Sequence, residues 1–146
     1  MFFGPKGWLF VMFGILGIFG EVIFTSIGSL ISKRSWRLQG TSYLWMFPIY
    51  GSIAFLFDPV NQLIAGWPWT ARGCAYMVVI FLVEYICGTV LKKVTGEHIW
   101  HYTGRFNLHG QIQLTYAPVW FCVGLLIERF YDDLVELSLW LAMHFG

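Results

Sequence analysis

The chain has 146 residues, of which 58% are hydrophobic and 12% are charged, and its formal net charge is +1. Soluble domains carry roughly 25% charged residues, so this composition excludes an ordinary water-soluble domain and predicts an integral membrane protein. Lys and Arg form no cluster dense enough to neutralise many phosphates, which argues against nucleic acid as a partner.

The first apolar stretch covers residues 7–31 and is long enough, at ~1.5 Å per residue, to cross a bilayer with some tilt. Lys6 before it gives this stretch some look of a signal sequence, but the apolar run continues to Ile31 and no small-residue cleavage site follows. We therefore predict a retained first span. Trp36, which follows among basic residues, is expected to anchor it at the interface.

The second apolar stretch covers residues 43–65 and is interrupted near its far end. Asp58 and Pro59 there are typical of a helix start, with Asp58 as N-cap and Pro59 in the first turn, so we predict a broken second span. The third stretch, residues 73–91, ends at Lys92 and Lys93 and predicts a third span.

Residues 96–111 are polar and aromatic, rich in Gly and His, and too numerous for a simple turn. We predict that this loop is re-entrant or folds back against the helices. A fourth span is predicted over 112–130, and residues 134–144 are too short to cross and predict an interfacial helix. The expected fold is a single all-α domain, residues 1–146, built as a compact bundle of about four transmembrane helices.

The basic residues predict the orientation, because Lys and Arg are enriched on the cytoplasmic side. With the N-terminus outside, six of them fall on the inner side: Lys33, Arg34, Arg37, Lys92, Lys93 and Arg105. Three fall on the outer side: Lys6, Arg72 and Arg129. We therefore predict a multi-pass protein whose N-terminus and C-terminus both lie on the non-cytoplasmic side.

Each predicted span carries an acid, and Glu21 and Glu84 fall near the middle of theirs. At helical spacing both acids share a stripe with glycines, and an acid facing hydrocarbon would cost several kcal/mol, so these stripes are expected to face other helices. The functional hypothesis is that Glu21 and Glu84 bind a cation, a proton or a cationic headgroup, or act as a coupled acid and base. The alternative is that each is protonated or hydrogen-bonded and only fixes helix register.

Asp58 and Glu128 come near the outer ends of their spans and are further candidates for this site. For Asp58 the helix start is a sufficient explanation, and for Glu128 a structural role beside Arg129 is the alternative. Arg105 in the loop is a candidate for an anionic group such as a lipid phosphate, and its alternative is a plain cytoplasmic basic residue.

Three histidines lie within the loop, at His98, His101 and His109. They could ligate a metal, but their spacing is nonspecific and no Cys or carboxylate completes a known pattern, so we predict neither a metal nor another cofactor.

Several separated motifs resemble one family. They are Gly20-Glu21-Val22-Ile23-Phe24-Thr25, Tyr43-Leu44-Trp45-Met46-Phe47-Pro48-Ile49-Tyr50-Gly51, Glu84-Tyr85 with Gly88, Trp100-His101-Tyr102-Thr103, and Phe106-Asn107-Leu108-His109-Gly110. Over residues 17–130 the chain is similar to the family called putative ABC-transporter type IV, which includes the transmembrane protein 229 group. The resemblance implies a small multi-span protein without an ATP-binding domain of its own, and no G-x-x-x-x-G-K-[ST] loop is present in this sequence.

The resemblance also implies site residues. The matching positions are Glu21, Glu84, Trp100, Tyr102, Asn107 and Gly110. The chain departs from the family at His101 and Thr103, where Asp and Ser are common, and at Arg105 and Gln111, where the family often has Pro and Arg. The resemblance therefore implies no role that depends on that loop acid or that Arg.

Three functions remain open. The first is a transport-related protein, either a permease-like subunit or a small carrier, whose polar site contains Glu21, Glu84, Trp100, Tyr102 and Asn107. The second is a membrane enzyme that acts on lipid headgroups, although no recognisable nucleophile or metal motif supports it. The third is an accessory or scaffold subunit of a larger complex. The expected partners are membrane lipids and either a partner membrane subunit or further copies of this chain.

Overall fold

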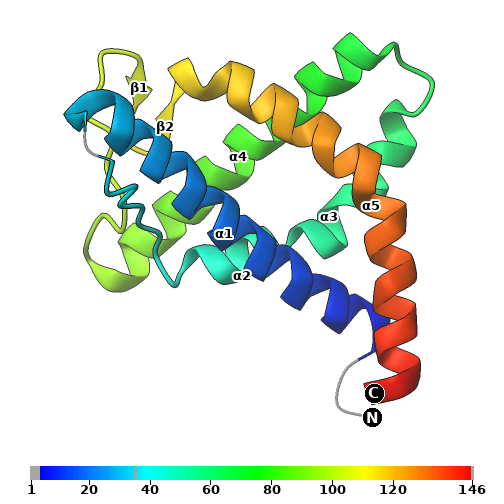
Figure 1. Ribbon diagram of the computed structural model, residues 1–146. Helices are drawn as coiled ribbons and strands as arrows, with labels where there is room; N and C mark the ends of the chain where they lie inside the picture. Colours follow the sequence, from blue (N-terminus) through cyan, green and yellow to red (C-terminus); the bar gives the residue numbers. More distant parts are fainter. Residues whose placement is uncertain (1–3, 35, 146) are drawn as a thin grey trace. The chain divides into compact units, whose positions relative to one another are not determined.

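The computed structural model describes residues 4–34 and 36–145, and the chain is mostly helical (Figure 1). The helices are α1 (Pro5–Lys33), α2 (Met46–Gly51), α3 (Ile53–Ile64), α4 (Trp69–Thr95) and α5 (Ala117–Phe145). A short antiparallel hairpin, β1 (Asn107–Leu108) and β2 (Ile112–Gln113), precedes a 3-10 turn (Leu114–Tyr116) that leads into α5. The chain divides into a first unit, Met1–Phe57 with Asp133–Gly146, and a second unit, Asp58–Asp132.

Two of the described helices, α1 and α4, are long and apolar enough to cross a membrane. The stretches that meet this criterion are Pro5–Ser32 and Trp69–Thr95, and an 18-residue segment of each has a mean hydropathy of 2.1. Helix α1 begins on Pro5, which suits a first turn that has no partner for its N–H, and ends at Arg34 in the left-handed conformation. The helices predicted over 7–31 and 73–91 are thus confirmed, and both are longer than predicted.

The second predicted span contains two helices, and its break is not where the sequence predicted it. Asp58 and Pro59 lie inside α3 and do not start it, so the predicted N-cap is wrong. The break falls at Ser52, whose hydroxyl donates to the Ile49 carbonyl at 2.6 Å and competes with the backbone for that acceptor. A small Gly-Ser pair is a common position for a helix irregularity, and here Gly51 and Ser52 form it.

Helices α1 and α2 lie side by side (Figure 1). They pack closely because glycines face aromatic rings. A Cβ added at Gly14 would lie 2.7 Å from the Phe47 ring, and one at Gly17 would lie 2.2 Å from Tyr50. In the opposite direction, the Phe10 ring of α1 occupies the space that a Cβ at Gly51 would need. The glycines of the predicted α1 stripe therefore do face another helix at this level, since only a residue without a side chain permits these contacts.

The fourth predicted span and the predicted interfacial helix are one continuous helix. Helix α5 starts at Ala117, five residues later than predicted, because residues 112–116 form β2 and the 3-10 turn. It then continues through Asp132 and Asp133 to Phe145, since neither Gly nor Pro occurs between Gly124 and Phe145 to end it. Acidic residues make membrane insertion costly but do not stop a helix, so the predicted separation near residues 131–133 is wrong.

Candidate functional site

The second unit holds Glu84 on a face of α4 that is small and buried. Gly73, Glu84 and Gly88 are all buried, as the predicted stripe requires, and Glu84 is only 8% exposed. The opposite face carries apolar side chains at i, i+4 spacing that are half exposed: Val78, Leu82, Ile86 and Val90. The buried face accepts aromatic neighbours, because a Cβ at Gly73 would lie 2.4 Å from the Phe121 ring of α5.

A tight hairpin follows α4 and shapes the loop. Helix α4 ends at Thr95 and is capped by Gly96, which has a φ of 78° and donates its N–H to the Lys92 carbonyl. The hairpin turns through His109 and Gly110, with φ values of 51° and 72°, and pairs Asn107 with Gln113. Asn107 stabilises this turn, because its carbonyl oxygen accepts the Gly110 N–H at 2.9 Å and its amide donates to the Gly104 carbonyl.

The loop contacts α4 at Gly88. A Cβ at this position would lie 2.0 Å from the Gln111 side-chain oxygen and 3.0 Å from the Trp100 ring. Gln111 is 4% exposed and Trp100 is 6% exposed, and the Trp100 indole N–H donates to the Gln111 carbonyl at 3.0 Å. Gly88 thus allows the loop to pack directly on the helix that carries Glu84, one turn away from that acid.

Tyr102 on this loop reaches the buried acid directly. Its hydroxyl donates a 2.8 Å hydrogen bond to Glu84 Oε1, and its ring packs edge-on against Tyr116. A buried carboxylate requires such donors, because leaving it without compensation costs several kcal/mol. Glu84, Tyr102 and Trp100, all predicted from the sequence, therefore lie within one cluster, which we call the Glu84 cluster together with Gln111 and Gly88.

The three loop histidines lie at the edge of this cluster and do not converge on a metal position. The Gln111 amide lies 3.1 Å from His98 Nδ1, the His98 and His101 rings meet edge-on at 4.8 Å, and the Tyr85 hydroxyl lies 3.0 Å from His109 Nδ1. Within residues 4–34 and 36–145, no group of three or more His, Cys, Asp or Glu side chains could hold a metal ion. Partial desolvation lowers the pKa of the His98 imidazole, and the nearby Lys92 and His101 act in the same direction.

The remaining predicted site residues lie elsewhere. Arg105 is exposed, with its guanidinium 5.9 Å from the centroid of the Phe106 ring. Glu128 on α5 forms a bidentate ion pair with Arg72 on α4, at 2.8–3.2 Å, and Arg72 also donates to the Trp67 carbonyl. The partner of Glu128 is therefore Arg72, and the neighbouring Arg129 lies over the Phe130 ring. Asp58 is partly buried within α3.

The first unit holds Glu21 in a different setting. The chain leaves α1 and returns along it as a strap, residues 38–42, that is neither helix nor strand. Ser42 donates a 2.7 Å hydrogen bond to Glu21 Oε2, and Ser26 donates to the Leu38 carbonyl at 2.9 Å. Gly40 lies so close to α1 that a Cβ there would be 2.0 Å from the Val22 carbonyl oxygen. The strap therefore covers half-buried Glu21 with polar backbone and hydroxyl groups.

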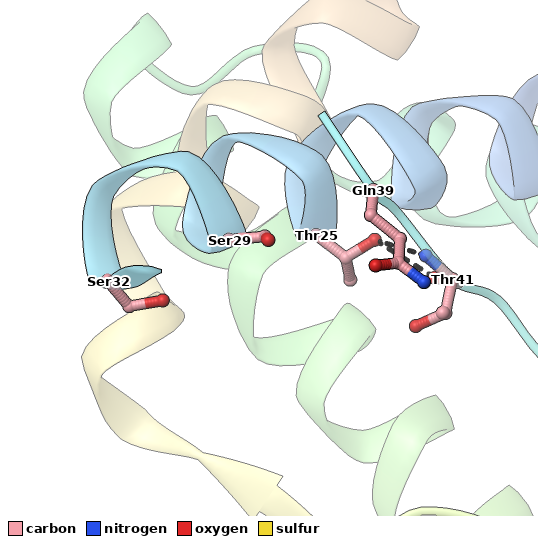
Figure 2. A pocket seen from close by; sticks show the side chains of 5 residues that line it. All are labelled: Thr25, Ser29, Ser32, Gln39 and Thr41. Atoms are coloured by element: carbon pink, nitrogen blue, oxygen red, sulfur yellow. Dashed lines mark hydrogen bonds between the residues drawn. The ribbon is translucent and has the colours of Figure 1, made fainter. Parts of the chain in front are cut away.

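A cavity of about 340 Å³ opens between the strap and the last turns of α1 (Figure 2). Its lining is neutral and polar throughout: Thr25, Ser29, Ser32, Gln39 and Thr41. Thr25 and Thr41 join the two walls, because the Thr41 N–H donates to the Thr25 hydroxyl oxygen at 2.9 Å. We call this cavity the hydroxyl groove.

A comparison of the sequence with known protein families identifies the family of this chain. Residues 8–144 match the model of the family described as Putative ABC-transporter type IV, which is nearly the entire chain. The chain belongs to this family. No solved structure matches the chain.

Membership of the type IV family agrees with the two long apolar helices, and together they indicate a transport-related membrane protein. The match also extends beyond residues 17–130, over which the sequence motifs show the resemblance, and includes most of α1 and α5. Both Glu21 and Glu84, with the strap and the loop that cover them, lie inside the matched region.

Sequence reasoning missed several residues that build these two sites. Gln111 was noted only as a departure from the type IV family, yet it is buried and joins Trp100 to His98. No role was predicted for Ser42 and Gly40, which lie between the first and the second apolar stretch. A run of hydroxyl, amide and glycine residues at 39–42 was the available signal, because extended backbone that contacts a polar helix face requires small and polar side chains.

Proposed function

We propose that this member of the type IV family is a transport protein, either a permease-like subunit or a small carrier, in which Glu84 binds a proton or a cationic group. By the same chemistry Glu21 is a second carboxylate for such a group. Carboxylates inside apolar membrane helices are expensive and commonly mark ion or proton pathways.

The observation that carries the proposal is the hydrogen bond from Tyr102 to buried Glu84. If Glu84 only fixed the position of α4 against another helix, a hydrogen bond to that helix would be sufficient. Here the hydroxyl that reaches the acid lies on a separate loop, which Trp100 and Gln111 position. The Tyr102 phenol can donate to the Glu84 carboxylate while no ligand is bound, and this hydrogen bond can break when a cation or proton binds the carboxylate. The same two residues can therefore stabilise both the empty and the occupied site.

We further propose a multi-pass arrangement with both termini on the non-cytoplasmic side. Helices α1 and α4 would cross in the same direction, α2 with α3 would form a broken second span, and the start of α5 would supply the fourth. The proposal is supported by the six basic residues that fall on the inner side against three on the outer. In this arrangement the loop 96–111 is a re-entrant cytoplasmic segment, and Arg105 in it would be available to a lipid phosphate.

The sequence contains no ATP-binding loop, so transport driven by ATP hydrolysis would need a partner subunit that binds ATP. Alternatively, several copies of this chain would work as a carrier driven by an ion gradient. Membrane lipids are the remaining expected partners.

The test uses the purified full-length chain in liposomes with pH-sensitive and cation-sensitive dyes inside. Wild-type protein should carry a flux that Glu84→Gln abolishes, and Glu21→Gln should reduce. Glu97→Gln is the matched control, because Glu97 is an exposed acid outside the spanning stretches, and it should leave the flux unchanged. Wild-type flux in the double Glu21→Gln, Glu84→Gln variant would contradict the proposal.

Two alternatives are separated by the same variants. If the protein is an enzyme that acts on lipid headgroups, Glu84→Gln should alter the lipid profile of cells without changing any flux. If it is a scaffold subunit, the double variant should be silent in both assays while a fixed partner still co-purifies.

A further inference from the structure

We propose that the hydroxyl groove binds an anionic glycerophospholipid through a polyol headgroup, such as glycerol or inositol. This site is separate from the proposed carboxylate chemistry and does not depend on it. Four features carry the inference: the free hydrogen-bonding groups of the groove, its apolar neighbouring stripe, its basic end and its position along α1.

The groove offers groups that the protein itself does not use. Among the described residues, the Ser29 hydroxyl and the Gln39 amide form no hydrogen bond with another residue, and both line the cavity. The Ser32 hydroxyl donates a hydrogen bond within its own helix, to the Gly28 carbonyl at 2.8 Å, and its oxygen can still accept one. A neutral lining with both donors and acceptors suits a ligand whose hydroxyls are also both, and a polyol is that ligand.

An exposed apolar stripe follows the groove along α1. Thr25, Ser29 and Ser32 lie on one helix face, at i, i+4 and i+7. The residue that precedes each of them belongs to a neighbouring stripe, which contains Phe24, Gly28 and Ile31. All three are exposed, and a Cβ at Gly28 would meet nothing within 4 Å. An acyl chain can lie along this open stripe while its headgroup occupies the groove beside it.

The end of the groove is basic and interfacial. Arg34 caps α1 in the left-handed conformation and is exposed, and Trp36 beyond it is 86% exposed, as expected for an anchor at the headgroup level. From Ser32 to Thr25 the groove extends about 10 Å along the helix, beginning at the basic end of α1. Arg34 can bind the lipid phosphate, and Ser29 and Gln39 can bind the hydroxyls of the polyol attached to it.

The binding test compares three lipids that share their acyl chains: phosphatidylglycerol, phosphatidic acid and phosphatidylcholine. Each displaces a tail-labelled fluorescent phosphatidylglycerol from the purified full-length chain in neutral detergent. Wild-type protein should prefer phosphatidylglycerol to phosphatidic acid about tenfold, as two additional hydrogen bonds predict, and should bind phosphatidylcholine least.

The variants separate the polyol from the phosphate. The double variant Ser29→Ala, Gln39→Ala should remove the preference for phosphatidylglycerol while leaving phosphatidic acid within twofold, since neither side chain supports the fold. Arg34→Gln should weaken both anionic lipids equally. Thr70→Ala, an exposed hydroxyl at the start of α4, is the control and should change nothing.

The inference is overturned if wild-type protein binds phosphatidylglycerol and phosphatidic acid equally, because the groove would then recognise charge alone. It is also overturned if the double variant keeps the full preference. Neither result touches the flux assay of Glu84, so the two proposals fail independently.

Discussion

Each unit contains an acid that is hydrogen-bonded by a hydroxyl group, and the two side chains that carry these hydroxyls differ in length. In each, an acid slightly past the middle of a long apolar helix accepts a hydrogen bond from a hydroxyl on the segment that follows the helix: Ser42 for Glu21 and Tyr102 for Glu84. Serine is short, so the strap backbone must lie against α1, which is why Gly40 meets the Val22 carbonyl. Tyrosine is long, so the loop after α4 can keep its own hairpin and still reach the acid. The length of the donor thus decides how closely the backbone approaches the helix.

The largest expected effect comes from the glycines that allow helix contact in each unit. Gly17→Val should clash with the Tyr50 side chain in the first unit, and Gly124→Val should clash with the Tyr76 Cβ, 2.3 Å away, in the second. Overpacking of this kind costs about 1–3 kcal/mol, because neither neighbour can move only its far end. Thermal unfolding in detergent, followed by tryptophan fluorescence, should show a clearly lower midpoint for both variants.

Gly20→Val is the matched control. Gly20 lies on the same helix as Gly17, and a Cβ at Gly20 would meet nothing within 4 Å. An equal loss of stability in Gly20→Val would mean that helix propensity, and not contact with Tyr50, explains the effect.

The next effect distinguishes the two hydroxyls. Tyr102→Phe and Ser42→Ala each remove one hydrogen bond to a carboxylate, for which we expect a cost of about 1 kcal/mol. The cost should be larger for Tyr102, because Glu84 is buried and water cannot replace the phenol, whereas Glu21 is half-buried. Hydrogen exchange should rise over residues 98–111 in Tyr102→Phe and over residues 38–42 in Ser42→Ala, and thermal midpoints give the order.

Tyr43→Phe, which removes an exposed phenol next to the strap, should affect neither segment. If Ser42→Ala proves more harmful than Tyr102→Phe, the greater burial of Glu84 does not control the strength of these bonds.

The long helices and the face of α4 that carries Glu84 could be predicted from the sequence. Long apolar stretches define α1 and α4 directly, because hydropathy over about 20 residues is a strong signal. The placement of Glu84 opposite Val78 and Leu82 also follows from helical spacing alone. No internal repeat is evident in the sequence, since Ser42 and Tyr102 differ in type and in their distance from the acid, 21 and 18 residues.

The errors have physical causes as well. Asp58 and Pro59 have the residue types of a helix start, but a proline can also lie within a helix when packing compensates for the missing hydrogen bond, and the break at Ser52 depends on a side-chain hydroxyl. The continuity of α5 was not predicted because Tyr131, Asp132 and Asp133 separate the apolar stretches 112–130 and 134–144, and charge limits insertion but not helix formation. The strap was missed because its register depends on contacts between residues far apart in sequence.

The smallest effect is a pH dependence confined to the second unit. His98 Nδ1 accepts from the Gln111 amide only while the imidazole is neutral, and partial desolvation with nearby Lys92 and His101 lowers its pKa below the usual 6.5. The packed loop therefore binds the proton less readily than the free loop, so the contribution of His98 is fully present above pH 6.5 and is lost as the pH falls below it. Hydrogen exchange over residues 98–111, corrected for intrinsic rates, should be faster at pH 5 than at pH 7.5, with no such change over residues 38–42. The difference should disappear in His98→Gln and persist in His144→Gln, where the histidine stacks on Trp140 of α5. A pH response that the strap shares would show that the carboxylates, which both units contain, titrate in this range, and that the histidine of the second unit is not its source.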